Sequence, residues 1–408
     1  MQLIARQNVY NIHNKGYSMT RFSFRAFTLS AALFAAPFAA LAHGESAFDI
    51  KASDKASLTA TILSEFDNAW AMTVLPDGHM LVTEKGGLIW LLSPNGAKLG
   101  QIANGPEVMA KGQGGLGDII LHPDFETTGQ VYISYVERDE NDDALSGAAV
   151  ALVSLTLTET GGSLSQDDIV WRQSPKVLGN GHYGHRMAVS PDRKLFITSG
   201  ERQKFSPAQN MSTNLGKVVR LNLDGTAPED NPFYTGHNGT ADQIWTLGHR
   251  NPLGIAFDAD GKLWVQEMGP KHGDELNYIQ RSKNYGYPFV SNGDHYSGVK
   301  IPDHDEMPIF EAPKASWVPA ISPAGLMIYS GEMFKDWQGD AFIGGLSSKA
   351  LIRVSFGEDD RGRPTAKETG RYEWGKRIRE VEQGPDGAIY VLEDKKGGRL
   401  IKLKPHDH

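Results

Sequence analysis

Residues 71–84 read AMTVLPDGHMLVTE, a stretch in which two short apolar runs stand on either side of Pro76, Asp77 and Gly78. Proline fixes φ at about −65°, and glycine and aspartate tolerate positive φ, so this trio is typical of a tight turn. The flanking runs are rich in strand-forming residues, and a turn between two such runs is typical of a hairpin. The segment therefore predicts one antiparallel pair of strands.

The same pattern returns along the rest of the chain. Further copies cover residues 117–137, 186–201, 254–267 and 381–394, and a more divergent copy covers 325–345. No long segment has the apolar period of an amphipathic helix, so an all-β chain is expected. Two stacked sandwiches would also be all-β, but they do not predict one hairpin repeated throughout. Radial repetition lets small sheets bury both faces, so the six hairpins predict a six-bladed β-propeller with four-stranded antiparallel blades.

The composition limits the chemistry that such a propeller can carry. The 408 residues include no Cys, which excludes disulfides, a thiolate nucleophile and metal sites built on thiolates. A bound metal must therefore use oxygen or imidazole ligands. The formal charge of −8 argues against a protein that binds nucleic acid through a net positive field.

The N-terminal segment has the layout of a secretory signal. Within residues 19–42, two arginines precede an apolar run that ends in a small-residue cleavage motif at Ala42. The run is shorter than the roughly 20 residues that span a bilayer, although a retained anchor helix is the alternative. We expect residues 1–42 to comprise an upstream extension, with the true start at Met19, and a cleaved signal peptide. Residues 43–408 are then expected to form a single propeller domain, periplasmic or secreted and not inserted in a membrane.

Polar side chains precede the hairpin turns at a nearly constant distance. They are Gln113, His182, Arg250 with its neighbour Asn251, and Arg377 with Arg379. Equivalent positions in successive blades lie at the same end of a propeller, so these groups are expected to form a ring around the axis. Glu201 and Lys349 follow hairpins and are expected at the same end. Any one of these residues is most simply a solvated loop residue, but cations gathered in an acidic protein are typical of a pocket for a small polyanion.

The segment GPKHGDE, residues 269–275, follows the fourth hairpin. Asp274 and Glu275 offer carboxylates, and the turn at Gly269 and Pro270 presents backbone carbonyls, which together suit a hard cation such as calcium. The spacing is not that of an EF-hand. Taken alone, a solvated acidic turn is an equally good interpretation.

Four motifs together resemble a known family. They are GNGHYGHR (179–186), GHRNPLG (248–254), EMGPKHGDELNYIQRSKNYGYP (267–288) and KRIREVEQGPDGAIYVLED (376–394). Their sequence and order are similar to those of the soluble pyrroloquinoline quinone (PQQ) dependent sugar dehydrogenases, the glucose/sorbosone dehydrogenase family, and most of all to its aldose sugar dehydrogenase branch. The similarity runs from about residue 55 to the C-terminus.

The resemblance implies a six-bladed propeller with PQQ across its mouth and calcium beside the quinone. By position, His182 is similar to the catalytic base. Arg250 and Asn251 would contact the quinone, Arg377 and Arg379 would hold its carboxylates, and Gln113 would lie beside substrate and cofactor.

The resemblance also implies two calcium sites. The backbone of Gly269 and Pro270 would bind the calcium of the cofactor. Asp274, Glu275 and the carbonyl of Tyr285 resemble ligands of a second calcium.

Two positions depart from the family pattern. Glu201 stands where the glucose enzymes have Asp, and its extra methylene leaves the hydrogen bond to His182 open at the level of sequence. The PQQ-binding lysine of the family falls nearest to Lys349.

The implied reaction is oxidation of an aldose at C1 to the lactone, by base-assisted hydride transfer to the quinone. A neutral imidazole suits removal of the hydroxyl proton, and the Glu201 carboxylate would stabilise the imidazolium formed on His182. Arg250 would stabilise the charge that develops on the quinone oxygen. His185 is the competing choice of base. We expect a small aldose as substrate, an unidentified electron acceptor and a monomeric protein.

Two other functions are compatible with the sequence. A calcium-dependent lactonase on the same fold would use the acidic run and a histidine without a quinone, but it leaves the paired Arg377 and Arg379 unexplained. A non-enzymatic propeller would bind a ligand or a protein on its polar face. The preferred sugar depends on the loops 202–214 and 291–316, whose shape the sequence does not give.

Overall fold

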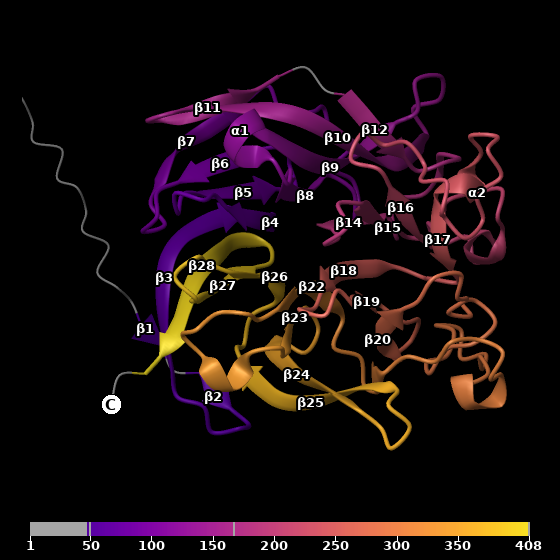
Figure 1. The fold of residues 1–408 in the computed structure, drawn as a ribbon. Helices are drawn as coiled ribbons and strands as arrows, with labels where there is room; N and C mark the ends of the chain where they lie inside the picture. The colour runs from indigo at the N-terminus through magenta and orange to yellow at the C-terminus, as the bar shows by residue number, and fades with distance from the viewer. Residues whose placement is uncertain (1–46, 49, 166–167, 407–408) are drawn as a thin grey trace, which may run out of the picture. The chain divides into compact units, whose positions relative to one another are not determined.

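The computed structural model describes residues 47–48, 50–165 and 168–406, within the compact unit Glu45–His408 (Figure 1). The expected start at Met19, the signal peptide and its cleavage after Ala42 lie outside the described residues. Among the described residues, none of the helices has the length and apolar character that a bilayer span requires.

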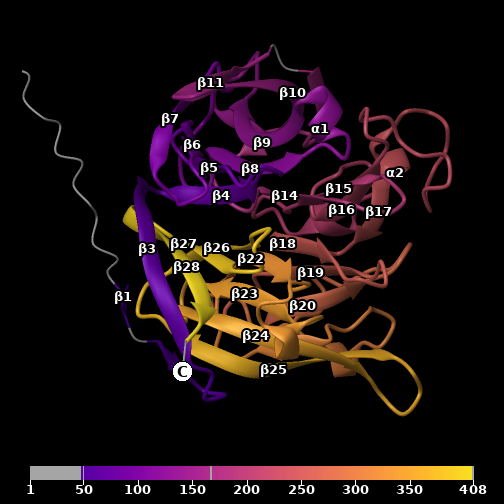
Figure 2. The ribbon, with the colours of Figure 1, turned by 60° about the vertical axis from the view of Figure 1, so that its left-hand side comes forward.

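Six antiparallel blades make up this unit, which confirms the predicted fold (Figures 1 and 2). The first blade contains β4 (Ala69–Val74), β5 (Met80–Glu84), β6 (Ile89–Leu92) and β7 (Lys98–Ala103). The second contains β8 (Leu116–Leu121), β9 (Gln130–Arg138) and β10 (Leu145–Thr158), with β12 (Asp168–Arg172) and β13 (Val177–Leu178) both paired to β10. The third contains β14 (Gly184–Val189), β15 (Leu195–Ser199), β16 (Lys217–Leu221) and β17 (Ile244–Leu247).

The remaining blades follow the same order. The fourth contains β18 (Pro252–Phe257), β19 (Leu263–Glu267), β20 (Asp274–Ile279) and β21 (Ala315–Trp317). The fifth contains β22 (Pro323–Ile328), β23 (Ala341–Gly345), β24 (Ala350–Glu358) and β25 (Pro364–Glu373), with β2 (Lys51–Ala52) added at its edge. The sixth contains β26 (Ile378–Gln383), β27 (Ile389–Glu393), β28 (Lys396–Pro405) and β3 (Leu58–Asp67), with β1 (Ala47–Phe48) paired to β3.

Helices are confined to the connections. The described α-helices are α1 (Phe125–Thr128) and α2 (Thr240–Gln243), and the 3-10 helices are Ser206–Gln209, His304–Glu306 and Lys335–Trp337. One short strand, β11 (Gly161–Leu164), pairs with both β10 and β7 and so joins the first two blades into one sheet.

The blades close into a ring by pairing the two ends of the chain. Each predicted hairpin supplies the first two strands of a blade, and the first strands contact one another in the order β4, β8, β14, β18, β22, β26 and back to β4. The antiparallel pair β3 and β28 runs from Leu58 opposite Pro405 to Asp67 opposite Lys396. This closure joins the sixth blade to the first and leaves no open seam in the ring.

The first hairpin forms for the reason its sequence indicates. The Gly78 N–H donates to the Leu75 carbonyl at 2.9 Å, and Gly78 adopts a φ of 87°. The third hairpin has arginine where this glycine would stand, and Arg193 takes the same left-handed conformation with a φ of 60°. The turn geometry therefore belongs to the fold and survives the loss of its usual residue.

Each first strand carries a β-bulge or an equivalent irregularity near its start. In the first three blades, the hydroxyls of Thr83, Ser134 and Thr198 on the second strands accept a backbone N–H beside the bulge. Thr83 Oγ1 accepts the Ala71 N–H at 3.1 Å and donates to the Gly117 carbonyl of the next blade at 2.7 Å. Bulges redirect neighbouring side chains, and these lie at the end of the strands where the predicted site residues stand.

Candidate active site

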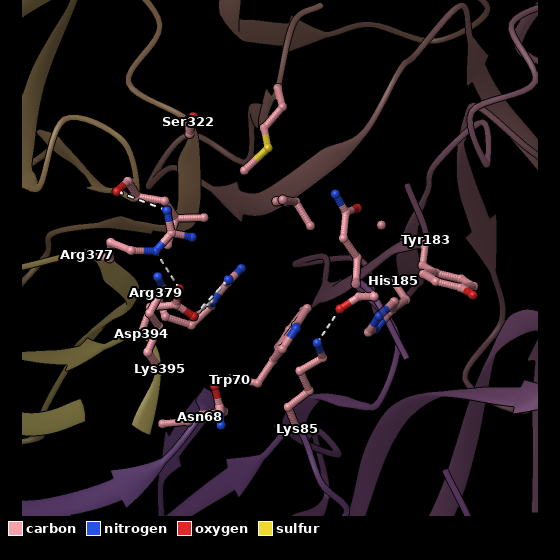
Figure 3. Close-up of a pocket in the computed structure, with 17 residues that line it drawn as sticks. Asn68, Trp70, Lys85, Tyr183, His185, Ser322, Arg377, Arg379, Asp394 and Lys395 are labelled. Atoms are coloured by element: carbon pink, nitrogen blue, oxygen red, sulfur yellow. Dashed lines mark hydrogen bonds and ion pairs between the residues drawn. The ribbon is translucent and has the colours of Figure 1, made fainter. Parts of the chain in front are cut away.

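Residues from all six blades, or from the loops beside them, line a cavity of about 420 Å³ (Figure 3). Three of the predicted residues, Gln113, Arg377 and Arg379, belong to its lining. The lining also contains residues that were not predicted, namely Asn68, Ala69, Trp70, Lys85, Asp394 and Lys395. Since the contributing segments surround the axis, the cavity follows from the closure of the ring.

Two arginines form a cationic wall on the sixth blade. Arg377 Nε donates to Asp394 Oδ2 at 2.7 Å, and Arg379 Nη2 donates to Asp394 Oδ1 at 2.9 Å. Burial raises the pKa of the Asp394 carboxyl, but the charges and hydrogen bonds of Arg379 and Arg377 outweigh it, so this pKa is lowered. Asp394 is therefore ionised and holds both guanidinium groups, each of which keeps further N–H donors for an anion.

An aromatic pair forms another part of the wall. The rings of Trp70 and His185 stack with centroids 4.9 Å apart, and the Arg186 guanidinium lies 4.0 Å from the centroid of Trp70. His185 Nδ1 is 2.8 Å from Ser134 Oγ. Burial and the nearby Arg186 charge lower the pKa of His185 to about 3, so this imidazole is neutral. Its geometry is that of a packed ring with one nitrogen already bonded to a hydroxyl.

Lys85 follows β5 directly and enters the same cavity. Its Nζ donates to the Gly112 carbonyl, next to Gln113. Its pKa is lowered by burial and by the Arg379 charge, against a smaller opposing effect of Asp394. Lys85 could have been predicted from the sequence, because it occupies the position just after a hairpin that Glu201 and Asp394 occupy in other blades.

His182 forms a dyad with Glu201. His182 Nδ1 lies 2.5 Å from Glu201 Oε1, and Glu201 is 0 % exposed. The other carboxylate oxygen accepts the backbone N–H of Lys204 and of Phe205, the latter at 2.7 Å. Glu201 therefore makes the hydrogen bond to His182 that the sequence alone did not decide.

The dyad is held next to the cavity by Gln113. The backbone N–H of His182 donates to Gln113 Oε1 at 2.7 Å, although His182 itself is not part of the cavity lining. Its neighbours Tyr183, Gly184 and His185 are. Gln113 therefore links the base predicted from the sequence to the cavity.

The protonation states of the dyad are complementary. Burial lowers the pKa of His182, the hydrogen bond that His182 donates to Glu201 opposes this, and the Arg250 charge adds to the lowering. Burial raises the pKa of Glu201, but the hydrogen bond and charge of His182 outweigh it, so the net shift is downward. At neutral pH the pair is a neutral imidazole beside a carboxylate, which is the arrangement of a general base with its supporting acid.

Arg250 and Asn251 lie in the connection between β17 and β18, where the Arg250 carbonyl accepts the Glu201 N–H at 2.9 Å. Neither residue lines the main cavity, and Arg250 lines a smaller cavity with Gly269 and Pro270. Arg250 Nη1 donates to the carbonyls of Met268 and Gly269, at 2.9 and 2.5 Å. Asn251 is fully buried, yet neither of its amide atoms has a hydrogen-bond partner in the structure, and Arg250 Nε also has none. Such orphaned buried groups are rare and mark a place where a polar ligand would complete the structure.

Of the residues predicted to hold calcium, four line a small cavity and one, Asp274, makes hydrogen bonds within the loop. Gly269, Pro270, Glu275 and Tyr285 line one small cavity, together with Glu267. Asp274 is absent from that lining. Its Oδ1 accepts the Gly269 N–H at 3.0 Å and its Oδ2 accepts the Ser322 N–H at 2.7 Å, so it organises the loop. Within the described part of the chain, no group of three or more His, Cys, Asp or Glu side chains is arranged to hold a metal.

Lys349 lies away from the cavity lining. It is exposed, with a φ of 53°, and its carbonyl accepts the N–H groups of Trp374 and Gly375 at 3.0 Å. The lysines that do line the cavity are Lys85 and Lys395.

Comparison with known proteins gives consistent results. The family model described as Glucose / Sorbosone dehydrogenase matches residues 66–402. Aldose sugar dehydrogenase YliI of Escherichia coli (strain K12) is 36 % identical over 364 residues, covering 86 % of this chain and 94 % of that protein. A crystal structure of the soluble aldose sugar dehydrogenase from Escherichia coli in the apo-form matches with a TM-score of 0.80 and 36 % identity, covering 86 % of this chain and 100 % of that one. The PQQ-bound form of aldose sugar dehydrogenase from Streptomyces coelicolor matches with a TM-score of 0.66 and 25 % identity, covering 86 % and 98 %.

Proposed function

This chain belongs to the glucose/sorbosone dehydrogenase family, and on that premise we propose that it is a PQQ-dependent oxidoreductase that converts aldose sugars to their lactones at C1. The observation that carries the proposal is the His182–Glu201 dyad, tied through Gln113 to the cationic cavity. A base beside an anion-binding cavity is what oxidation of a neutral sugar by a bound anionic quinone requires.

The residues present fit such a cofactor. PQQ is a planar aromatic tricarboxylate, and the cavity offers cationic side chains from different blades beside the flat Trp70 ring. Outside the lining of this cavity, the unpartnered amide nitrogen of Asn251 and Nε of Arg250 are the further donors that we assign to quinone oxygens. Arg377 and Arg379 would hold carboxylates in forked geometry. When bound, the quinone supplies the two-electron acceptor that the reaction needs.

The protein residues carry the proton chemistry. The aldose loses its C1 hydrogen with the bonding electron pair and its C1 hydroxyl proton, which together make the two-electron oxidation to the lactone. Because Glu201 fixes Nδ1 of His182, Nε2 is the nitrogen that would receive the hydroxyl proton. The buried carboxylate then stabilises the imidazolium.

Calcium would be held mainly by backbone oxygen. Gly269 and Pro270 are the proposed ligands beside the cofactor, and Asp274, Glu275 and the Tyr285 carbonyl are proposed for a second ion. Burial raises the pKa of Asp274 to about 6 despite hydrogen bonds from three backbone N–H groups, so ionisation of this carboxyl is costly in the protein alone. A nearby cation would relieve that cost.

The cellular location and the oligomeric state are further parts of the proposal. We propose that the mature chain acts as a monomer in the periplasm or outside the cell, and passes electrons to an acceptor still to be identified. The signal-like layout of residues 19–42 supports export.

Reconstitution tests the proposal. Purified apo-protein is mixed with PQQ and calcium, an aldose is added, and the absorption spectrum of the quinone is followed. Spectral reduction together with lactone formation is expected. Hydrolysis of lactones without PQQ would instead favour the lactonase, and a silent spectrum without hydrolysis would favour a binding propeller.

A further inference from the structure

Lys85 is fixed in place by contacts between the first two blades. Its backbone N–H donates to the Asn68 carbonyl at 3.0 Å, and its carbonyl accepts the Leu116 N–H at 3.0 Å. Gly115 permits this approach, because a Cβ at that position would lie 2.2 Å from the Lys85 carbonyl oxygen. Backbone contacts therefore determine where this side chain begins.

The ammonium group of Lys85 has N–H donors available for a ligand. Its Nζ donates to the neutral Gly112 carbonyl, and among the described residues no carboxylate lies within ion-pair distance of that nitrogen. An ammonium has three N–H donors, so two remain. Arg377 and Arg379 differ in this respect, because Asp394 already neutralises part of their charge.

The charge of the cavity is unbalanced. Its lining contains the cationic side chains of Lys85, Arg377, Arg379 and Lys395 but one carboxylate, that of Asp394. The His185 imidazole adds no charge, because its pKa is about 3. The formal charge of this lining is thus +3 at neutral pH, which a trianion would balance.

Lys85 also lies apart from the arginine pair. Figure 3 shows Lys85 and the cluster of Arg377, Arg379 and Asp394 on different sides of Trp70. A single carboxylate bound in forked fashion by the arginines would leave Lys85 free for a different carboxylate.

We propose that Lys85 is a further cofactor-binding residue, whose ammonium pairs with a carboxylate of PQQ other than those held by Arg377 and Arg379. The inference rests on the proposed function, since it takes PQQ as the ligand. The alternative is a purely structural role, in which Lys85 only donates a hydrogen bond to the Gly112 carbonyl. In that case the charge of Lys85 would have no effect on cofactor affinity.

The test is equilibrium binding of PQQ to the full-length mature apo-protein, at fixed calcium and at several salt concentrations. Equilibrium dialysis with absorbance detection gives Kd without any need for turnover. Three variants are compared: Lys85→Gln, Lys85→Arg and Lys262→Gln. Lys262 is a matched control, because it is a lysine on the turn between β18 and β19, outside this cavity.

Lys85→Gln should raise Kd by about tenfold or more at low salt and flatten the dependence of Kd on salt, because one charge-assisted contact is lost. Lys85→Arg should stay within about threefold of wild type, and Lys262→Gln should match wild type. Thermal unfolding of each variant separates altered affinity from altered folding.

Three outcomes would overturn the inference. Wild-type Kd in folded Lys85→Gln shows that the charge is not used. Equal weakening in Lys85→Gln and Lys85→Arg assigns the effect to the Gly112 contact. Absence of PQQ binding by the wild-type protein removes the proposed function as well, whereas tight wild-type binding with an unchanged Lys85→Gln removes this inference alone.

Discussion

Glu201 contacts His182 with one carboxylate oxygen, at 2.5 Å, and uses the other to hold the loop that follows it. That loop is held in an unusual backbone conformation, since Arg202, Gln203 and Phe205 all have φ values near 60°. Non-glycine residues in this region cost about 1–3 kcal/mol each, so the surrounding contacts must maintain it. The same buried side chain thus orients the base and holds the loop that follows it.

Replacement of the base gives the first prediction. His182→Ala should lower kcat by about 100-fold or more, because general-base catalysis typically contributes that much. PQQ affinity should change little, since His182 is not part of the cavity lining. Steady-state kinetics and PQQ binding are measured on the same preparation. His185→Gln is the comparison, and near-wild-type turnover in PQQ-loaded His182→Ala would end the assignment.

The second prediction concerns Glu201. Glu201→Gln should reduce kcat by about two orders of magnitude, because an amide does not stabilise an imidazolium as a carboxylate does. Glu201→Asp shortens the side chain and should restore part of that loss. If both variants lose kcat equally while remaining folded, support of the loop rather than charge explains the role of Glu201.

The third prediction is the pH dependence. Because the pKa of His182 is lowered from 6.5, the base is already neutral at pH 7, and kcat/KM should fall only as pH drops below 6.5. Glu201 raises this pKa through its hydrogen bond, so Glu201→Gln should move the acidic limb to still lower pH. If the acidic limb of the kcat/KM profile moved to higher pH in Glu201→Gln, Glu201 would not raise the pKa of His182, and the prediction would be wrong. Profiles of kcat/KM between pH 4 and pH 9 decide the matter, with structural integrity checked by circular dichroism.

The fourth prediction concerns the arginine wall. Arg377→Ala should weaken PQQ binding by about 10- to 100-fold, the range expected for loss of a charge-assisted pair. Both substitutions leave Asp394 with one partner, but the Arg379 side chain is 16 % exposed against 32 % for Arg377, so Arg379→Ala should lower stability more than Arg377→Ala does. Dialysis and thermal unfolding together separate the two effects. Unchanged PQQ affinity in both variants would be incompatible with an anion site here.

Local sequence signals predicted the hairpins, because each turn is determined by a few adjacent residues such as those at 76–78. They did not predict that β3 closes the ring against β28, since that pairing joins positions more than 300 residues apart, such as Leu58 and Pro405. The edge additions β1 and β2 escaped for the same reason: strands of two residues leave no periodic pattern.

The site divides in a similar way. Gln113, Arg377 and Arg379 were predicted because their offsets from the turns repeat, and the fold turns equal offsets into proximity. Lys349 was predicted only as the lysine nearest to the family position, and the structure does not include it in the cavity lining. The direction of a side chain in a loop depends on backbone angles that spacing does not encode.

The last prediction tests the aromatic wall through a glycine. A Cβ at Gly117 would lie 2.1 Å from His185 Cε1 and 2.9 Å from Ser134 Oγ, both of them buried. Gly117→Ala should therefore push His185 from its stack with Trp70 and destabilise the fold by about 1–3 kcal/mol, the usual cost of overpacking. Gly86→Ala is the matched control, because a Cβ there meets nothing within 4 Å. Chemical unfolding gives both free energies. Since His185 lines the cavity, PQQ affinity should fall in Gly117→Ala and not in Gly86→Ala. Equal free energies of unfolding in the two variants would contradict the prediction, because they would mean that the second blade accommodates the added methyl group without cost.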